Sequence, residues 1–262
     1  MTHRRVSVIG VHAAIVSLLV GGAIGNLAYA EEVKLIASAG VRSVVSELSG
    51  QFEATTGHKV VTDFAPFANW KRRIDSGETF DIAILSPALI DDYIKQGRIA
   101  SDTRINFGRA GIGVGIRRGA PKPDIGSVES LKRTLLDAKS IAYSARSNGE
   151  PGESGVYFLS LLDRLGIARE MKSKIRGYEV LAMTNSVASG ETELVVTSIT
   201  IIIPAQGLEL VGEVPSYVQS YVLFTAGVSA ATKSKEVARA LLRFMTAPTA
   251  SNVFKANGMR PG

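Results

Sequence analysis

From residue 33 onward, the chain alternates short, continuous apolar segments with longer segments whose apolar residues recur every three or four positions. The first pattern is typical of buried strands, and the second is typical of helices with one buried face. Such alternation favours α/β layers in which a mixed, mostly parallel sheet is flanked by helices. The predicted strands are 33–37, 59–64, 80–85, 105–117, 140–145 and 194–203, and the predicted helices are 44–55, 70–76, 87–96, 128–138, 156–165, 235–245 and 249–257.

The predicted strand 105–117 is unusual because four glycines, at positions 108, 111, 113 and 115, lie inside it. Glycine weakens the interior of a strand, so this segment is expected to bend or to approach another backbone closely. The chain is expected to return at 222–229, which would give a second crossing. One α/β unit interrupted by another in this way predicts two lobes joined by two crossovers. We expect 31–112 with 226–262 to form lobe 1, and 113–225 to form lobe 2.

Loops rich in hydroxyl groups and small residues follow several predicted strands and precede helices. Small residues let backbone N–H groups point toward a ligand, and a helix N-terminus carries about half a positive charge. In open α/β sheets, ligands bind at the carboxyl ends of strands, beside these termini. Each serine alone could be an ordinary helix cap, but their recurrence predicts an anion-binding site. The loops are Ser38-Ala39-Gly40, Pro66-Phe67-Ala68-Asn69, Ser86-Pro87 and Gly152-Glu153-Ser154-Gly155.

The usual motifs of catalysis and of metal binding are absent from the sequence. It has no Gly-x-Ser-x-Gly elbow, no phosphate-binding loop and no cysteine, and His58 is the one histidine after residue 30. A single imidazole in a predicted turn cannot supply a histidine-rich zinc site or a Ser-His-Asp arrangement. We therefore expect a protein that is not an enzyme and that uses no cofactor and no metal.

The first thirty residues have the pattern of a secretory signal peptide. Arg4 and Arg5 precede an apolar run over 6–23, and Ala28-Tyr29-Ala30 is a small-x-small cleavage site. A retained membrane anchor is the alternative, because the apolar run approaches the ~20 residues that span a bilayer. The cleavage site favours removal, and no cysteine is present to carry a lipid. We expect a mature chain that begins at Glu31 and diffuses in the periplasm as a monomer.

The charge of the mature chain is mild. The whole sequence has 30 basic and 24 acidic residues, and removal of the two leader arginines leaves 28 basic residues against 24 acidic ones. These charges are scattered and do not form a basic stripe with interleaved aromatic residues. Nucleic acid is therefore not expected as a partner.

A set of short segments spread along the mature chain carries a recognisable pattern. They are Leu-Ile-Ala-Ser-Ala at 35–39, Phe-Glu-Ala-Thr-Thr-Gly at 52–57, Phe-Asp-Ile-Ala-Ile-Leu-Ser at 80–86, Leu-Arg-Phe-Met-Thr-Ala-Pro at 242–248 and Asn-Gly at 257–258. Together they resemble the periplasmic molybdate-binding family of solute-binding proteins. The resemblance implies a type 2 periplasmic-binding-protein fold, a small anion held between two lobes, and an ABC permease of the inner membrane as partner.

The resemblance also implies ligand contacts. The first binding serine of the family falls on Ser38, and its backbone donor before the fifth-strand helix falls near Ser154. Its second serine falls in Phe67-Ala68, where this chain has no hydroxyl group. The tyrosine of the family appears here as Thr197, and the aspartate that follows it is absent. The resemblance thus implies the family's fold and transport role with an altered set of ligand contacts.

We expect Ser38, Ser86 and Ser154 to form a neutral cradle for a molybdate- or tungstate-like oxyanion, and two alternatives remain open. Arg146 could instead bind a small organic carboxylate through its planar guanidinium group. A sensory partner protein with the same fold is a further alternative. The candidate ligand-binding residues are Ser38, Ala39, Phe67, Ala68, Asn69, Ser86, Arg146, Ser154, Gly155 and Thr197.

Overall fold

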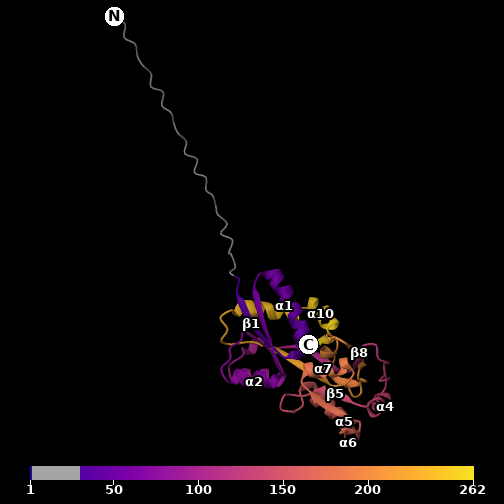
Figure 1. Ribbon diagram of the computed structural model, residues 1–262. Coiled ribbons are helices and arrows are strands. Elements are labelled where there is room, and N and C mark those ends of the chain that lie inside the picture. Colours follow the sequence, from indigo (N-terminus) through magenta and orange to yellow (C-terminus); the bar gives the residue numbers. More distant parts are fainter. Residues whose placement is uncertain (2–29) are drawn as a thin grey trace.

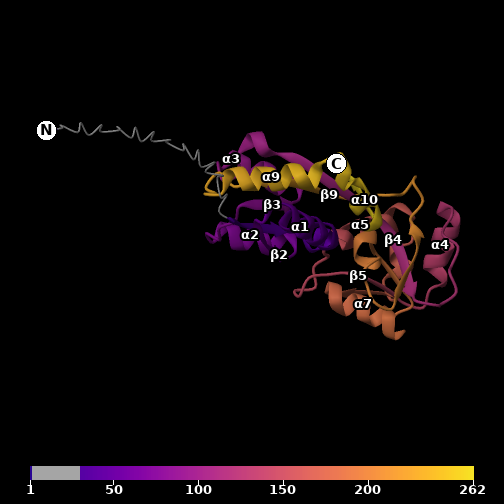
Figure 2. The same cartoon turned by 90° about the horizontal axis from the view of Figure 1, so that it is seen from above.

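The computed structural model describes residue 1 and residues 30–262, so nearly all of the predicted signal peptide lies outside the described residues. Helices flank a twisted sheet, and two lobes are visible in Figures 1 and 2. The strands are β1 (Glu32–Ala37), β2 (Lys59–Phe64), β3 (Ile82–Leu85), β4 (Ile105–Arg117), β5 (Ile141–Ser144), β6 (Ile175–Tyr178), β7 (Leu194–Ser198), β8 (Leu208–Glu213), β9 (Tyr221–Val228) and β10 (Met259–Pro261). The α-helices are α1 (Arg42–Thr56), α2 (Phe67–Asp75), α3 (Pro87–Lys95), α4 (Val128–Asp137), α5 (Glu153–Arg164), α6 (Ala168–Met171), α7 (Val180–Ser189), α8 (Ile199–Ile202), α9 (Lys235–Thr246) and α10 (Ser251–Ala256).

The sheet is mixed, and its strand order is β2-β1-β3-β9-β4-β7-β5-β6, with β8 and β10 also paired to β4. We use lobe 1 for the part around β1, β2 and β3, and lobe 2 for the part around β5, β6 and β7. Inside each lobe the central strand pairs in parallel, β1 with β2 and β3, and β5 with β6 and β7. The antiparallel strands β4 and β9 connect the lobes. The predicted two-lobed α/β fold with two crossovers is confirmed.

Strand β4 passes from one lobe into the other. Its residues up to Gly111 pair with β9, and those from Ile112 onward pair with β7. A Cβ atom on Gly113 would lie 2.5 Å from the Cγ2 atom of Ile199, and one on Gly115 would lie 2.8 Å from the Cγ1 atom of Val195. Glycine is therefore needed in this strand because α8 and β7 pack directly against its backbone. The predicted lobe boundaries at 112/113 and 225/226 remain predictions.

Both faces of the lobe 1 sheet are covered. In β1, Leu35 packs in the hydrophobic cluster of α1 and α9, whereas the next residue, Ile36, packs in the cluster of α2 and α3. Successive side chains of a strand point to opposite faces, so a strand covered on both sides must be apolar at every position. This is why the second half of β1, at 35–37, and all of β3 read as continuous apolar runs in the sequence, whereas Lys34 of β1 is only half-buried.

The predicted strand 194–203 is wrong in its second half. Strand β7 ends at Ser198, and the next residues form the short helix α8. A continuous apolar run cannot distinguish a buried strand from a buried helix by periodicity. Here Ile199 and Ile202 lie in the helix and pack against the glycines of β4, so they are buried just as they would be in a core strand.

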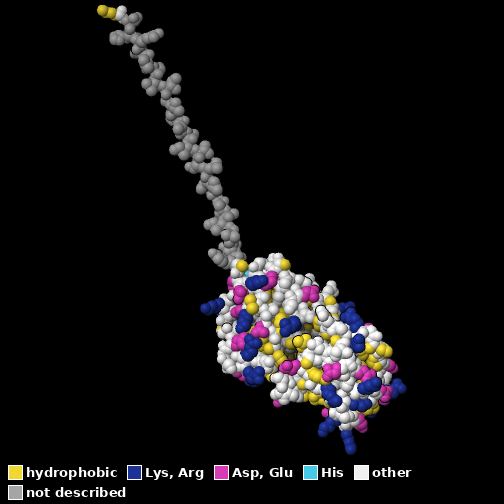
Figure 3. Space-filling view, in the orientation of Figure 1, with side chains coloured by type: hydrophobic (Ala, Val, Ile, Leu, Met, Phe, Trp, Pro, Cys, Tyr) yellow, Lys and Arg dark blue, Asp and Glu magenta, His cyan; other side chains and the backbone are white. Residues whose placement is uncertain are grey.

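The surface carries charges of both signs, and Figure 3 shows them interspersed over the visible face. Among the described residues, no helix is long and apolar enough to cross a membrane.

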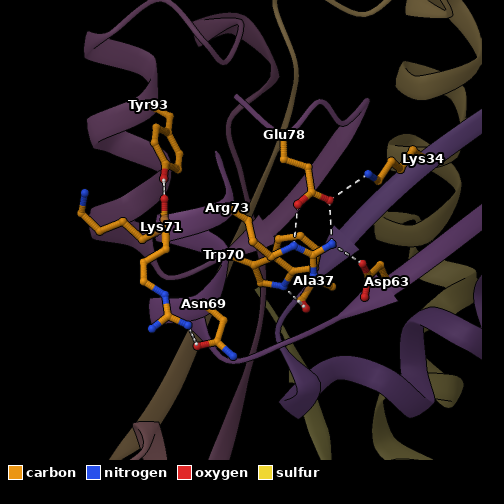
Figure 4. A network of polar contacts seen from close by, with 10 residues as sticks. Lys34, Ala37, Asp63, Asn69, Trp70, Lys71, Arg73, Glu78 and Tyr93 are labelled. Atoms are coloured by element: carbon orange, nitrogen blue, oxygen red, sulfur yellow. Dashed lines mark hydrogen bonds and ion pairs between the residues drawn. The ribbon is translucent and has the colours of Figure 1, made fainter. Parts of the chain in front are cut away.

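A polar network fixes helix α2 against strands β1 and β2 (Figure 4). The indole Nε1–H of Trp70 donates a hydrogen bond to the carbonyl oxygen of Ala37 at 2.7 Å. The guanidinium of Arg73 stacks on the Trp70 ring at 4.1 Å from its centroid, and donates to Asp63 at 2.7 Å and to Glu78 at 2.6 Å. Because Ala37 ends β1, this network sets the position of the α2 N-terminus relative to the loop that follows β1.

The network predicts a pH dependence of stability. The hydrogen bonds from Arg73, with a further contribution from Lys34, lower the pKa of Glu78 from 4.5 to about 2. A carboxyl group with a lowered pKa stabilises the fold above pH 4.5 and loses this effect as the pH falls through about 2. We expect the urea midpoint of the wild type to fall between pH 5 and pH 2.5 more steeply than that of Glu78→Gln. The exposed acid Glu170 supplies a control, Glu170→Gln, which should follow the wild type; parallel curves for wild type and Glu78→Gln would contradict the prediction.

Candidate functional site

A cleft of about 180 Å³ lies between the two lobes, where strand ends and helix N-termini converge. Lobe 1 contributes the loop after β1 and the start of α2. Lobe 2 contributes the segments that follow β5, β6 and β7, and strand β9 adds two apolar side chains. The lining residues are Ser38, Ala39, Gly40, Pro66, Asn69, Ser144, Ala145, Arg146, Ser147, Gly152, Glu153, Ser154, Glu179, Val180, Ser198, Ile201, Val222 and Phe224.

A larger hollow, of about 700 Å³, lies at the other end of lobe 1. It is lined by the amino-terminal parts of β1 and β3, where Lys34 and Glu78 already form an ion pair at 2.9 Å. Ligands of open α/β sheets bind at the carboxyl ends of the strands instead. The cleft between the lobes is therefore the better candidate, although it is the smaller of the two.

The structure brings five of the predicted site residues to this cleft, namely Ser38, Ala39, Asn69, Arg146 and Ser154. Phe67, Ala68 and Gly155 lie beside it in the first turns of α2 and α5. Thr197 is buried behind Ser154, and the two hydroxyl oxygens are 2.7 Å apart. Ser86 does not line the cleft; it caps α3, where its Oγ atom accepts a hydrogen bond from the Leu89 N–H at 3.4 Å. Their roles as ligand contacts remain predictions.

Ser38 stands directly after β1, and its orientation is fixed by backbone contacts. Its N–H donates to the carbonyl oxygen of Ile84 at 3.0 Å, and its Oγ atom accepts from the Gly40 N–H at 3.2 Å. A hydroxyl group that accepts in this way still has its proton to donate. A Cβ atom on Gly40 would lie 3.0 Å from the Phe224 ring, so the small residue keeps this turn close to β9.

Helix α5 starts in direct contact with the end of β5. The Gly152 N–H donates to the carbonyl oxygen of Ser144 at 2.8 Å, and a Cβ atom on Gly155 would lie 2.1 Å from that same oxygen. Only a residue without a side chain allows this approach. The contact places Glu153 and Ser154, which are on the first turn of α5, at the wall of the cleft.

Two acidic residues of the cleft, Glu153 and Glu179, were missed by the sequence analysis. Glu153 accepts a hydrogen bond from the Phe67 N–H at 2.7 Å, across 86 positions of sequence. Glu179 directly precedes α7 and is exposed. Glu153 was visible inside the Gly152–Gly155 loop, but no local pattern could indicate that it meets α2. The cleft is thus not the neutral cradle that the serines alone suggested.

Arg146 is the basic side chain among the lining residues. Its Nη1 atom contacts a carboxylate oxygen of Glu150 at 3.0 Å, and its Nε atom is buried without a hydrogen-bond partner among the described residues. The contacts with Asn148 and Arg146 hold the pKa of Glu150 below its ordinary value. A buried N–H with no acceptor is costly unless another group satisfies it. Arg146 is therefore suited to receive an anion.

Metal chemistry finds no support in the described part of the chain, where no group of three or more histidine, aspartate or glutamate side chains could hold a metal ion. The functional groups that the cleft offers are hydroxyls, helix N–H groups, one guanidinium and two carboxylates. Such a set can bind a small polar anion and can also accept protons from it.

Comparisons with known proteins show the family and the fold of the chain. Residues 33–260 match the family described as bacterial extracellular solute-binding protein. Aconitate isomerase of a Pseudomonas species is 27% identical over 233 residues, which are 87% of each chain. The molybdate-binding protein ModA of Azotobacter vinelandii is 25% identical over 253 residues, 93% of this chain and 96% of that protein. The solved periplasmic molybdate-binding protein of Azotobacter vinelandii has the same fold, with a TM-score of 0.72 and 19% identity over 88% of this chain and 99% of that one.

Proposed function

Because the chain belongs to the family of bacterial extracellular solute-binding proteins, we propose that it captures a small organic carboxylate in the cleft between its lobes. It works in the periplasm as a monomer and hands its ligand to the permease of an ABC importer. The observation that carries this proposal is Arg146, a guanidinium at the cleft whose buried Nε–H has no described acceptor. The planar guanidinium matches the geometry of a carboxylate and binds it through parallel hydrogen bonds.

The acidic residues of the cleft favour a carboxylate over a molybdate- or tungstate-like oxyanion. A tetrahedral dianion offers only acceptor atoms, so it would meet repulsion from Glu153 and Glu179 with no hydrogen bond in return. An organic acid that also carries a hydroxyl group or a protonated carboxyl can donate to these side chains. The proposal therefore places the carboxylate near Arg146 and the donor group near Glu179, because Glu153 already accepts a hydrogen bond from the Phe67 N–H.

A second candidate function is isomerisation of an unsaturated carboxylate. Glu153 supports it, because this carboxylate lies at the cleft and could move a proton between two carbon atoms of a bound ligand. The relative that is named aconitate isomerase points to the same chemistry. In this candidate, Arg146 binds the substrate and Glu153 is the catalytic base.

A binding panel on the mature chain tests these proposals together. We expect the melting temperature to rise with at least one of cis-aconitate, citrate, malate and lactate, and to stay unchanged with molybdate, tungstate and sulfate. A ligand at about 100 times its Kd stabilises by about 2.7 kcal/mol. Arg146→Ala should weaken the binding by about ten- to a hundred-fold, because a charge-assisted hydrogen bond contributes about 1.5–3 kcal/mol.

The control for this panel is Arg176→Ala, which removes an exposed arginine of β6 and should bind as the wild type does. A shift with molybdate or tungstate alone would replace the carboxylate proposal by the oxyanion one. Proton NMR of cis-aconitate, incubated with wild type and with Glu153→Gln, separates capture from isomerisation. Conversion by the wild type that Glu153→Gln lacks would establish the second candidate.

A further inference from the structure

One hydrogen bond spans the mouth between the two lobes, and a charged side chain makes it. A carboxylate oxygen of Glu153, in the first residue of α5, accepts from the N–H of Phe67, the first residue of α2, at 2.7 Å. The residue before α2 is Pro66, whose side chain makes no capping hydrogen bond. The other lobe therefore supplies the cap that most helices receive from their own N-cap residue.

The Glu153 carboxylate is in a favourable electrostatic position. It lies in the first turn of its own helix and contacts the first N–H group of another, so the partial positive charges of two helix N-termini act on it. Both helices are long enough, at 12 and 9 residues, to have several aligned peptide dipoles. Hydrogen bonds to a charged acceptor are stronger than those between neutral groups.

This hydrogen bond differs in position from an ion pair that lies beside the strand crossing between the lobes. Arg260 of β10 binds Glu213 of β8 at 3.2 Å, and both strands pair with β4, the strand that crosses between the lobes. That ion pair lies beside the crossover and would move little if the lobes rotated. The contact between Glu153 and Phe67 lies on the cleft side, among the residues that opening would separate.

We propose that Glu153 is an intramolecular latch, whose carboxylate holds the lobes together and competes with an anionic ligand for the N-terminus of α2. That Glu153 holds the lobes together concerns the protein alone, whereas its competition with a ligand rests on the proposed function. An anion that enters the cleft must displace the carboxylate or share the helix terminus with it. Removal of the latch should therefore open the lobes and strengthen the binding of anions.

The first experiment needs no ligand. The chain has no cysteine, so Lys95→Cys on α3 and Arg133→Cys on α4 give one labelling site in each lobe. Pulsed electron paramagnetic resonance then measures the distance between two spin labels in dialysed protein. We expect Glu153→Ala to add a second, clearly different population of distances that the parent lacks. Glu179→Ala is the matched control, because it removes an equal charge from the same cleft without breaking the bond to α2.

Identical distance distributions for the parent and Glu153→Ala would overturn the latch, and so would an equal change in Glu179→Ala. The second experiment is calorimetry with cis-aconitate and with molybdate as probes. We expect Glu153→Ala to bind the preferred probe about ten-fold more tightly than the wild type does, with Glu153→Gln between the two. Weaker binding by Glu153→Ala would show that Glu153 holds the ligand, which overturns the competition. If neither probe binds any variant, the proposed function fails, and the label distances alone decide the latch.

Discussion

Trp70→Ala is expected to lower the free energy of unfolding by about 3–5 kcal/mol, the usual cost of removing a large aromatic side chain from a core. The side chain of Trp70 is fully buried, and its Nε1–H donates to the Ala37 carbonyl at 2.7 Å. Alanine leaves a cavity under α2 and leaves Arg73 without the ring on which it stacks, and the Ala37 carbonyl keeps the hydrogen bond from the Ala65 N–H at 3.1 Å but loses the one from Trp70. All of these losses affect α2, the helix whose first turn lines one side of the cleft.

Urea denaturation followed by far-UV circular dichroism measures this effect. Trp70 is the single tryptophan of the chain, so fluorescence cannot follow the variant. The control is Tyr217→Ala, which removes an aromatic side chain that is 90% exposed and should change stability by less than about 0.5 kcal/mol. Equal midpoints for wild type and Trp70→Ala would mean that the packing of α2 does not stabilise lobe 1.

Gly155→Ala is expected to destabilise the protein by about 1–3 kcal/mol, in the range of an overpacked core, and to abolish the ligand-induced shift in melting temperature. Alanine favours helices over glycine by about 1 kcal/mol, which acts in the opposite direction. The steric clash is expected to outweigh this gain in stability, because the new Cβ atom would lie 2.1 Å from the backbone oxygen of Ser144. To relieve this clash, the first turn of α5, which carries Glu153 and Ser154, would have to move.

Gly50→Ala separates the steric effect from helix propensity. Gly50 lies inside α1, it is exposed, and an added Cβ atom would meet nothing within 4 Å. This substitution should therefore stabilise the protein by about 0.4–1 kcal/mol. Thermal melting of both variants, with and without the ligand from the binding panel, makes the comparison. If Gly155→Ala is as stable as Gly50→Ala, the close approach of α5 to β5 is not a constraint on the fold.

The sequence by itself determined the order of most elements and the double crossover, although β6, α7 and β8 were not predicted. Burial on both faces requires apolar residues at Leu35, Ile36 and Ala37 of β1 and along all of β3, so the pattern was readable in the residues themselves. The glycines of β4 could be recognised in the same way, because a backbone that other elements approach closely excludes side chains. The position of Ser38 followed as well, since a residue directly after a central strand must lie at the carboxyl edge of the sheet.

Only the tertiary structure decided which of the strand-end residues meet. Ser86 and Ser38 have the same local signature, yet Ser86 caps α3 away from the cleft, whereas Ser38 lines it. Glu153 reaches the Phe67 N–H, and Arg73 reaches Asp63 and Glu78, through the packing of helices and strands. Helix and strand periodicity depends on residues a few positions apart. A contact over 86 positions instead depends on strand order and on how the two lobes face each other, which no local pattern encodes.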